Sequence, residues 1–175
     1  VACTLDATIG DPRTLPHPVR WMGKLVAYGE RSIRRFCGGS RSLRIAGSVL
    51  AVGLPSLAFL LSWTLIAAGA TAHEWVGRGI GIYLASTALA WRDLIDHVGA
   101  VSDALKAGSL DQARQKVGLI VGRDTNNLSE TEVVRATVET IAESASDGVI
   151  APLLYLAVGG PPLALAYKAV STLDS

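Results

Sequence analysis

The longest uncharged stretch of the chain covers residues 45–72 and contains no Asp, Glu, Lys or Arg over about 28 positions. A helix needs about 20 apolar residues to cross the hydrocarbon core of a bilayer. The stretch therefore predicts a transmembrane helix, and Pro55 within it predicts a kink that neighbouring helices can accommodate. The alternative is a buried helix of a soluble protein.

The composition agrees with a membrane protein. Of the 175 residues, 50% are hydrophobic, 18% are charged and 6% are aromatic. The apolar share comes from Ala, Leu, Val, Ile and Gly, which allow helices to pack closely in a bilayer. The net charge of +1 gives no reason to expect nucleic acid as a partner. We therefore predict an all-α fold, namely a multi-pass integral membrane helical bundle with a cytoplasmic helical segment.

A second apolar run covers residues 79–91, which is about 13 positions and a marginal span by itself. Together with the first stretch it predicts a membrane hairpin over residues 45–91; a re-entrant or surface helix is the alternative. Arginines gather just before the hairpin: Arg31, Arg34, Arg35, Arg41 and Arg44. Positively charged flanks favour the cytoplasm, and two crossings return the chain there. The charged residues 92–147 are therefore expected to be cytoplasmic helices.

Two motifs within this segment, Ser109-Leu-Asp-Gln112 and Ser129-Glu-Thr-Glu132, have the form of a capping box at a helix start. The first helix is expected to end near Gly122 and the second near Gly148, with residues 123–127 as the loop between them.

Another uncharged run follows over residues 148–167, and Gly159-Gly-Pro-Pro162 interrupts it. Such an interruption favours a broken or re-entrant segment that lines a polar site. We interpret residues 1–175 as a single membrane domain that is incomplete at both ends.

An acidic stripe follows the helix that begins at Ser129. Helical spacing places these residues on one side: Glu132, Arg135, Glu139, Glu143 and Asp147. It places an apolar set on the other side: Val134, Val138, Ile141 and Ala145. Like charges one turn apart cost about 0.2–0.5 kcal/mol, and Mg²⁺ would relieve that cost by binding carboxylates together with substrate phosphates. The alternative is a solvated acidic face that Arg135 neutralises.

Two further polar clusters flank apolar runs. Near the start, several prolines and glycines predict a rigid turn that holds Asp11, His17 and Arg20, although Arg20 in an interfacial turn is the alternative. Near the end, Lys168 could contact phosphate or serve as a snorkelling anchor. His73 and His97 are interpreted as a loop residue and a helix-face residue.

Several short motifs resemble the CobD/CbiB family in their order and spacing. They are Gly10-Asp-Pro12, Pro16-His-Pro-Val-Arg20 to Gly23, Val121-Gly-Arg-Asp-Thr125, Glu139 to Glu143, Ser146-Asp-Gly148, Ala151-Pro152, Tyr167-Lys168 and Thr172-Leu-Asp174. The resemblance covers essentially the whole chain, which looks like about the first half of the family's usual length. Ser144 and Ser171 stand where the family often has Asn.

The resemblance implies adenosylcobinamide-phosphate synthase activity, a carbon–nitrogen ligation in cobalamin biosynthesis at the inner cell membrane. ATP and Mg²⁺ would support amide formation between a propionate carboxylate of the corrinoid adenosylcobyric acid and aminopropanol phosphate, or aminopropanol. The alternatives are an AmpE-like regulatory membrane protein without catalysis and a membrane transporter. An oligomer is compatible with each of them.

The same resemblance, together with the polar clusters, suggests roles for individual residues. For metal binding or amine deprotonation we predict Asp11, Glu139, Glu143 and Asp147, with Glu139, Glu143 and Asp147 as the Mg²⁺ ligands. For phosphate or substrate contacts we predict Arg20, Arg123, Asp124, Lys168 and Asp174. His17 is a candidate for proton transfer.

Overall fold

The computed structural model describes Thr4, residues 18–122 and residues 124–174. Asp11, His17 and Arg123 therefore lie outside the described residues. The longer elements are the helices α2 (Pro18–Phe36), α3 (Ser40–Ala72), α4 (Glu74–Thr87), α5 (Trp91–Lys106), α6 (Leu110–Val117), α7 (Glu130–Ala145) and α8 (Ala151–Asp174), with a π-helical turn, η1 (Ser146–Ile150), between the last two. No strand occurs in the described part of the chain, so the all-α prediction is confirmed.

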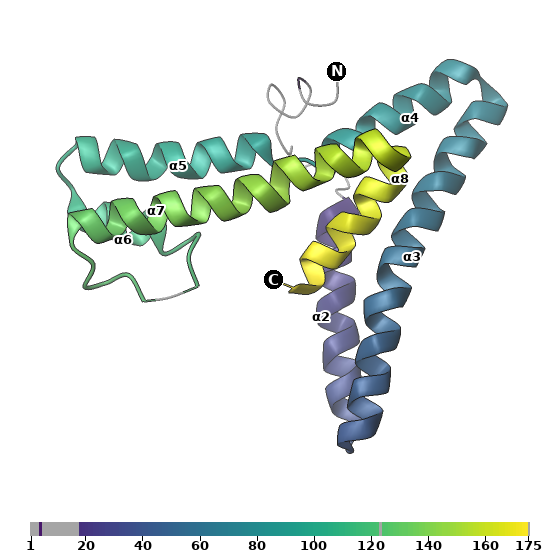
Figure 1. The fold of residues 1–175 in the computed structure, drawn as a ribbon, viewed down its shortest axis with the longest axis horizontal. Helices are drawn as coiled ribbons and strands as arrows, with labels where there is room; N and C mark the ends of the chain where they lie inside the picture. The colour runs from purple at the N-terminus through teal and green to yellow at the C-terminus, as the bar shows by residue number, and fades with distance from the viewer. Residues whose placement is uncertain (1–3, 5–17, 123, 175) are drawn as a thin grey trace.

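The helices form two packed bodies (Figure 1). We call α2, α3, α4 and α8 the stalk, and its core consists of Met22, Leu54, Ala58, Leu84, Ala88, Ala164, Leu165 and Ala169. We call α5, α6 and α7 the arm, and its core consists of Val101, Ala104, Ala113, Val117, Val133 and Ala136. The two cores share no residue, so the connection between the bodies depends on the segments that join them.

Helices α3 and α4 form a helical hairpin in the region of residues 45–91, while its insertion in a membrane stays a prediction. Helix α3 is 33 residues long and continues through Pro55. Close packing with α4 depends on small residues, because a Cβ atom added at Gly77 would lie 2.9 Å from the backbone nitrogen of Ala70. At the tip, the Nδ1 atom of His73 accepts a hydrogen bond of 3.2 Å from the backbone N–H of Trp75.

Two helical stretches are long and apolar enough to cross a membrane. They are Ser40–Ala72 and Glu130–Asp174, with mean hydropathies of 2.0 and 1.8 over their most apolar windows. Only 11% of the first window is buried within the chain. Helix α4, with 14 residues, is shorter than a span requires. The second candidate is therefore the C-terminal stretch and not residues 79–91.

The C-terminal stretch does not form one straight helix. Its backbone leaves helical geometry at Gly159 and Gly160, and Gly160 has a φ of 68°, which glycine tolerates because it lacks a Cβ atom. The chain then turns back, and the rings of Tyr155 and Tyr167 stack with centroids 4.7 Å apart. The predicted break in residues 148–167 is confirmed. The predicted helix end near Gly148 is wrong, because the helix passes through η1 into α8.

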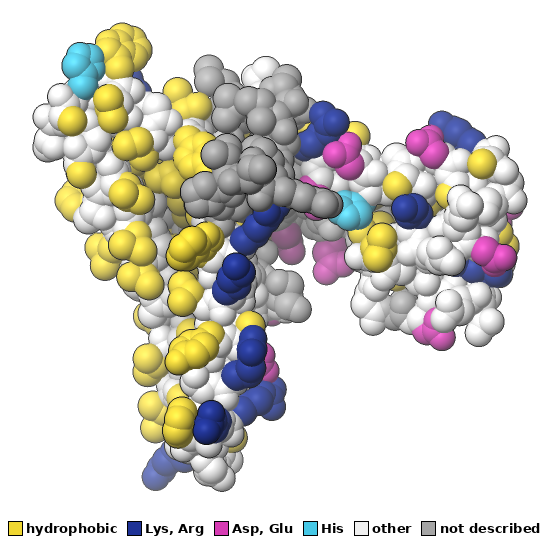
Figure 2. Space-filling model, turned by 180° about the vertical axis from the view of Figure 1, so that it is seen from behind, with side chains coloured by type: hydrophobic (Ala, Val, Ile, Leu, Met, Phe, Trp, Pro, Cys, Tyr) yellow, Lys and Arg dark blue, Asp and Glu magenta, His cyan; other side chains and the backbone are white. Residues whose placement is uncertain are grey.

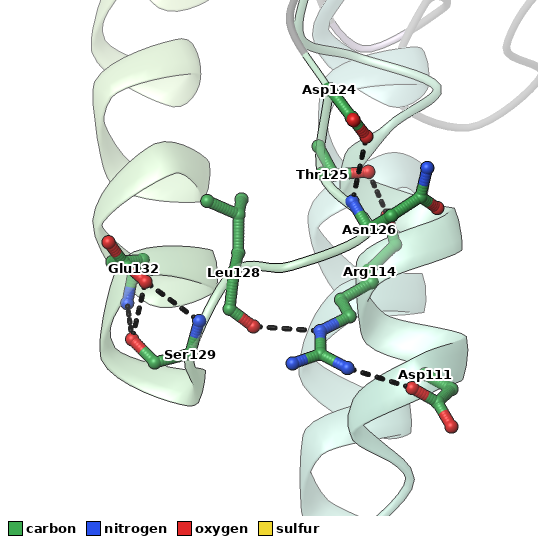
Figure 3. Close-up of polar contacts among 8 residues, drawn as sticks. All are labelled: Asp111, Arg114, Asp124, Thr125, Asn126, Leu128, Ser129 and Glu132. Carbon is green, nitrogen blue, oxygen red and sulfur yellow. Dashed lines mark hydrogen bonds and ion pairs between the residues drawn. The ribbon is translucent and has the colours of Figure 1, made fainter.

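The start and the end of α6 differ from the expectation. Helix α6 ends at Val117 and not near Gly122, and Ser109 forms no side-chain capping bond at its start. The loop after α6 is held against that helix, because the Thr125 hydroxyl donates a hydrogen bond of 2.9 Å to the backbone carbonyl of Arg114 (Figure 3). Ser129 and Glu132 do form the predicted capping box, since the Ser129 N–H donates to the Glu132 carboxylate at 2.8 Å.

Helix α7 packs through a different face from the one that its apolar spacing suggests. Its buried residues are Val133, Ala136 and Thr137. Val134 and Val138, on the apolar side expected from the sequence, are 44% and 58% exposed. Val133 and Ala136 of this buried face belong to the core of the arm, to which α5 and α6 contribute Val101, Ala104, Ala113 and Val117.

Candidate functional site

An open cleft of about 740 Å³ lies where the arm joins the stalk. Five segments supply its walls: the start of α5, the turn after α6, the end of α7, η1 and the returning half of α8. The polar side chains that line it are Asp93, His97, Thr140, Glu143, Ser144, Asp147, Lys168 and Ser171. Residues from both bodies therefore face one cavity.

The π-helical turn η1 joins the two bodies at this cleft. The backbone N–H of Ala90, which precedes α5, donates to the carbonyl of Gly148 at 3.0 Å. Gly148 is buried, and a Cβ atom there would lie only 3.3 Å from the Cβ atom of Ala90. Because π turns insert an additional residue into a helix and often mark functional sites, η1 can present Asp147 to the cleft while the helix continues.

The structure brings together three of the predicted site residues. Glu143 comes from the end of α7, Asp147 from η1 and Lys168 from α8, and all three line the cleft. The hydroxyl of Tyr167 donates to the Oδ1 atom of Asp147 at 3.4 Å, which is a long hydrogen bond. These three predicted residues bring two carboxylates and one ammonium group to the cleft, and they lie within 25 positions of one another along the chain.

Other predicted residues are not among those that line the cleft: Arg20, Asp124, Glu139 and Asp174. Glu139 accepts a hydrogen bond of 2.8 Å from the Nε atom of Arg135, which matches the alternative of an acidic face neutralised by that arginine. Asp124 accepts from the backbone N–H of Asn126 at 3.0 Å within the loop before α7 (Figure 3). Asp11, His17 and Arg123 lie outside the described residues.

The cleft also contains polar residues that the sequence did not assign to the site. Asp93 and His97 come from the first turns of α5, and Ser144 and Ser171 come from α7 and α8. The only signal for the first pair is their spacing of four residues, which places both on one face of a helix. The two serines at which the chain departs from the resembled family pattern thus face the same cavity.

The donor set of the cleft fits a divalent cation that shares its coordination with a phosphate group. Among the described residues, no group of three or more His, Cys, Asp or Glu side chains is arranged to hold a metal ion. Glu143 and Asp147 provide two carboxylates in one cavity. Mg²⁺ is commonly bound by one or two carboxylates together with substrate phosphates and water.

Comparison with known proteins identifies the family. The family model for CobD/Cbib protein matches residues 1–175. The chain belongs to the CobD/CbiB family.

Several CobD/CbiB relatives are similar over the full chain. The chain is 47% identical to cobalamin biosynthesis protein CobD of Klebsiella pneumoniae, and the match covers 100% of this chain and 55% of that protein. It is 46% identical to the CobD protein of Citrobacter koseri and 43% identical to cobalamin biosynthesis protein CbiB of Salmonella typhi, with the same coverage. The chain thus spans about half the length of these relatives. No solved structure matches it.

Proposed function

We propose that the protein acts in cobalamin biosynthesis as an ATP-dependent ligase. It joins a carboxylate of adenosylcobyric acid to aminopropanol phosphate, or aminopropanol, and forms adenosylcobinamide phosphate or adenosylcobinamide. Membership of the CobD/CbiB family and the names of its relatives support the pathway. The observation that carries the reaction type is the convergence of Glu143, Asp147 and Lys168 in one cleft.

The cleft residues match the needs of a ligation through an activated carboxylate. The carboxylate attacks the terminal phosphorus of ATP, which gives an acyl phosphate and ADP, and the amine then displaces phosphate. Negative charge moves between oxygens in both steps, so fixed positive groups lower the barrier. Lys168 supplies such a charge, and the hydroxyls of Ser144 and Ser171 can orient phosphate oxygens.

Glu143 and Asp147 would hold Mg²⁺, which would supply neutralising charge to the phosphates when bound. The other residues assigned from the sequence remain part of the proposal for the complete protein. They are Asp11, His17, Arg20, Arg123, Asp124, Glu139 and Asp174.

We also propose that the protein is a multi-pass protein of the inner cell membrane, with the cleft open to the cytoplasm. The apolar surface of α3 supports insertion, because Val49, Val52 and Leu60 are 67%, 69% and 56% exposed. Figure 2 shows Lys and Arg side chains gathered at the end of the stalk where α2 meets α3, a pattern typical of a cytoplasmic flank. ATP and corrinoid intermediates would reach the cleft from that side.

The experiment is a ligation assay with the purified full-length protein, adenosylcobyric acid, aminopropanol phosphate, ATP and Mg²⁺. We expect Asp147→Asn to lower the rate of amide formation by about 10²–10³-fold, because one of the two carboxylates that would hold Mg²⁺ at the phosphates is lost. Asp103→Asn is the matched control, since Asp103 is exposed on α5 and does not line the cleft. Equal activity of both variants would contradict the proposed site, and an inactive wild-type protein would contradict the proposed reaction.

A further inference from the structure

His97 lines the cleft, and the proposed ligation assigns no role to it. It lies on α5 and lines the same cavity as Glu143, Asp147 and Lys168. Its side chain is 38% exposed, so the ring is partly sheltered and still within reach of a substrate. The ring is therefore placed to exchange a proton with a bound ligand.

One hydrogen bond determines which ring nitrogen can act. The Nδ1 atom of His97 lies 2.7 Å from the backbone carbonyl oxygen of Asp93. A carbonyl oxygen only accepts hydrogen bonds, so Nδ1 must carry the hydrogen. In the neutral imidazole, Nε2 then holds the lone pair and is the proton acceptor. The Asp93 carboxylate lies 3.5 Å from Nδ1 and stabilises the positive charge that forms when Nε2 is protonated.

The charged groups that line the two cavities next to His97 come from five elements. They are Asp93 and Asp96 from α5, Lys116 from α6, Glu143 from α7, Asp147 from η1 and Lys168 from α8. Acidic and basic groups therefore both line the cavities that the ring faces.

We infer that His97 is the general base that deprotonates the amine substrate in the second step of the ligation. This inference rests on the proposed function. Aminopropanol phosphate is an ammonium ion in neutral water and must lose a proton before its nitrogen can attack. Nε2 takes that proton and frees the nitrogen lone pair, which then attacks the acyl carbon. As the C–N bond forms, the C–O bond to phosphate breaks, and phosphate leaves with the electron pair of that bond and takes up the second proton that the nitrogen loses.

A histidine suits this step better than the neighbouring carboxylates do. Carboxyl groups in general titrate at about pH 4 and are weak bases, whereas an imidazole titrates near neutrality. Glu143 and Asp147 are also the groups that would hold the metal. In this assignment, Asp147 of η1 and Lys168 of α8 serve the phosphates, and His97 of α5 transfers the proton.

The test separates the two steps by replacing the amine with hydroxylamine, which is largely unprotonated at neutral pH and does not need a base. The full-length protein is assayed for amide formation with aminopropanol phosphate and for hydroxamate formation with hydroxylamine. We expect His97→Gln to lower amide formation by about 10²–10⁴-fold, the usual contribution of a general base, while hydroxamate formation stays close to that of the wild type. His73→Gln, at the tip of the α3–α4 hairpin, is the matched control and should retain both activities.

The outcomes distinguish the inference from the function on which it rests. A wild-type protein that makes neither product overturns the proposed function and this inference with it. An active wild type with full amide formation in His97→Gln overturns the inference alone. If His97→Gln loses both activities, His97→Ala with added imidazole decides, because restored amide formation supports a base and no restoration overturns it.

Discussion

At the residue scale, Ser109 and Ser129 show how one sequence signature leads to two local structures. Both serines precede a helix and are followed three positions later by Gln or Glu. The Ser129 hydroxyl accepts from the backbone N–H of Glu132 at 3.4 Å, while Ser109 makes no side-chain capping bond. The backbone at Ser109 has a φ of −99° and a ψ of 83°, so its hydroxyl does not face the first turn.

This difference predicts unequal costs for the same substitution. We expect Ser129→Ala to lower the free energy of unfolding by about 0.5–2 kcal/mol, because it removes a cap from the start of α7. Ser109→Ala is the matched control and should have little effect. Chemical denaturation of the purified full-length protein would measure both. Equal losses would show that the capping box does not stabilise α7.

The acidic residues of α7 show what helical spacing can and cannot predict. Spacing correctly places Glu139 and Glu143 on one face. It does not show that the cleft begins only at Thr140, so that Glu143 lines it while Glu139 pairs with Arg135. That boundary depends on the angle at which α5 and α8 approach, which no local pattern contains.

At the element scale, the contact between α3 and α4 depends on glycine. A Cβ atom at Gly77 would lie 2.9 Å from both Cα and N of Ala70, and backbone atoms cannot rotate away as a side chain can. The two helices would have to separate. A Cβ atom at Gly79, on the same helix, would meet nothing within 4 Å.

We therefore expect Gly77→Ala to destabilise the full-length protein by about 1–3 kcal/mol, as overpacking in a tight core does. Gly79→Ala should be neutral or slightly stabilising, because alanine favours a helix over glycine by about 0.5–1 kcal/mol. Thermal unfolding in detergent would compare the two variants. The packing account fails if Gly77→Ala is tolerated as well as Gly79→Ala.

The stretch from α7 to α8 shows why the end of that helix could not be predicted. Ser146-Asp-Gly148 contains weak helix formers and reads as a stop signal. In the structure, the chain instead forms a π turn, because the carbonyl of Gly148 binds Ala90 and Ala151 continues the helix. The helix therefore continues through residues whose local preference is to stop it, and a contact between distant parts of the chain accompanies that continuation.

At the scale of the whole molecule, the sequence predicted the helical class, the α3–α4 hairpin and the broken C-terminal segment. These features depend on the length of the uncharged stretches and on the positions of glycine and proline, which are local properties of the sequence. The division into stalk and arm and the membership of Asp93 and His97 in the cleft could not be predicted. They depend on how α5 packs on α7, a contact between segments about 40 positions apart.

The proposed orientation in the membrane predicts that the tip of the α3–α4 hairpin and the arm lie on opposite sides of the membrane. In a full-length protein with Cys3 and Cys37 replaced by Ser, we expect Ala72→Cys to react with an impermeant maleimide in intact cells. Asp103→Cys, in the arm, should react only after the inner membrane is permeabilised. The reason is that the arginine-rich flank favours the cytoplasm and α3 is long enough to place the hairpin tip on the other side. Helix α4 is short for a span and would return the chain through locally thinned lipid. Labelling of Asp103→Cys in intact cells would contradict this orientation.

The central claim is that ATP phosphates bind in the cleft between stalk and arm. The lysines of the chain are Lys24, Lys106, Lys116 and Lys168, and of these only Lys168 lines that cleft. An acyl-phosphate derivative of ATP transfers its acyl group to a lysine close to the phosphates, and peptide mapping identifies that lysine. We expect labelling of Lys168 in the full-length protein that excess ATP prevents. ATP-sensitive labelling of Lys24 or Lys106 with Lys168 unmodified would contradict the account.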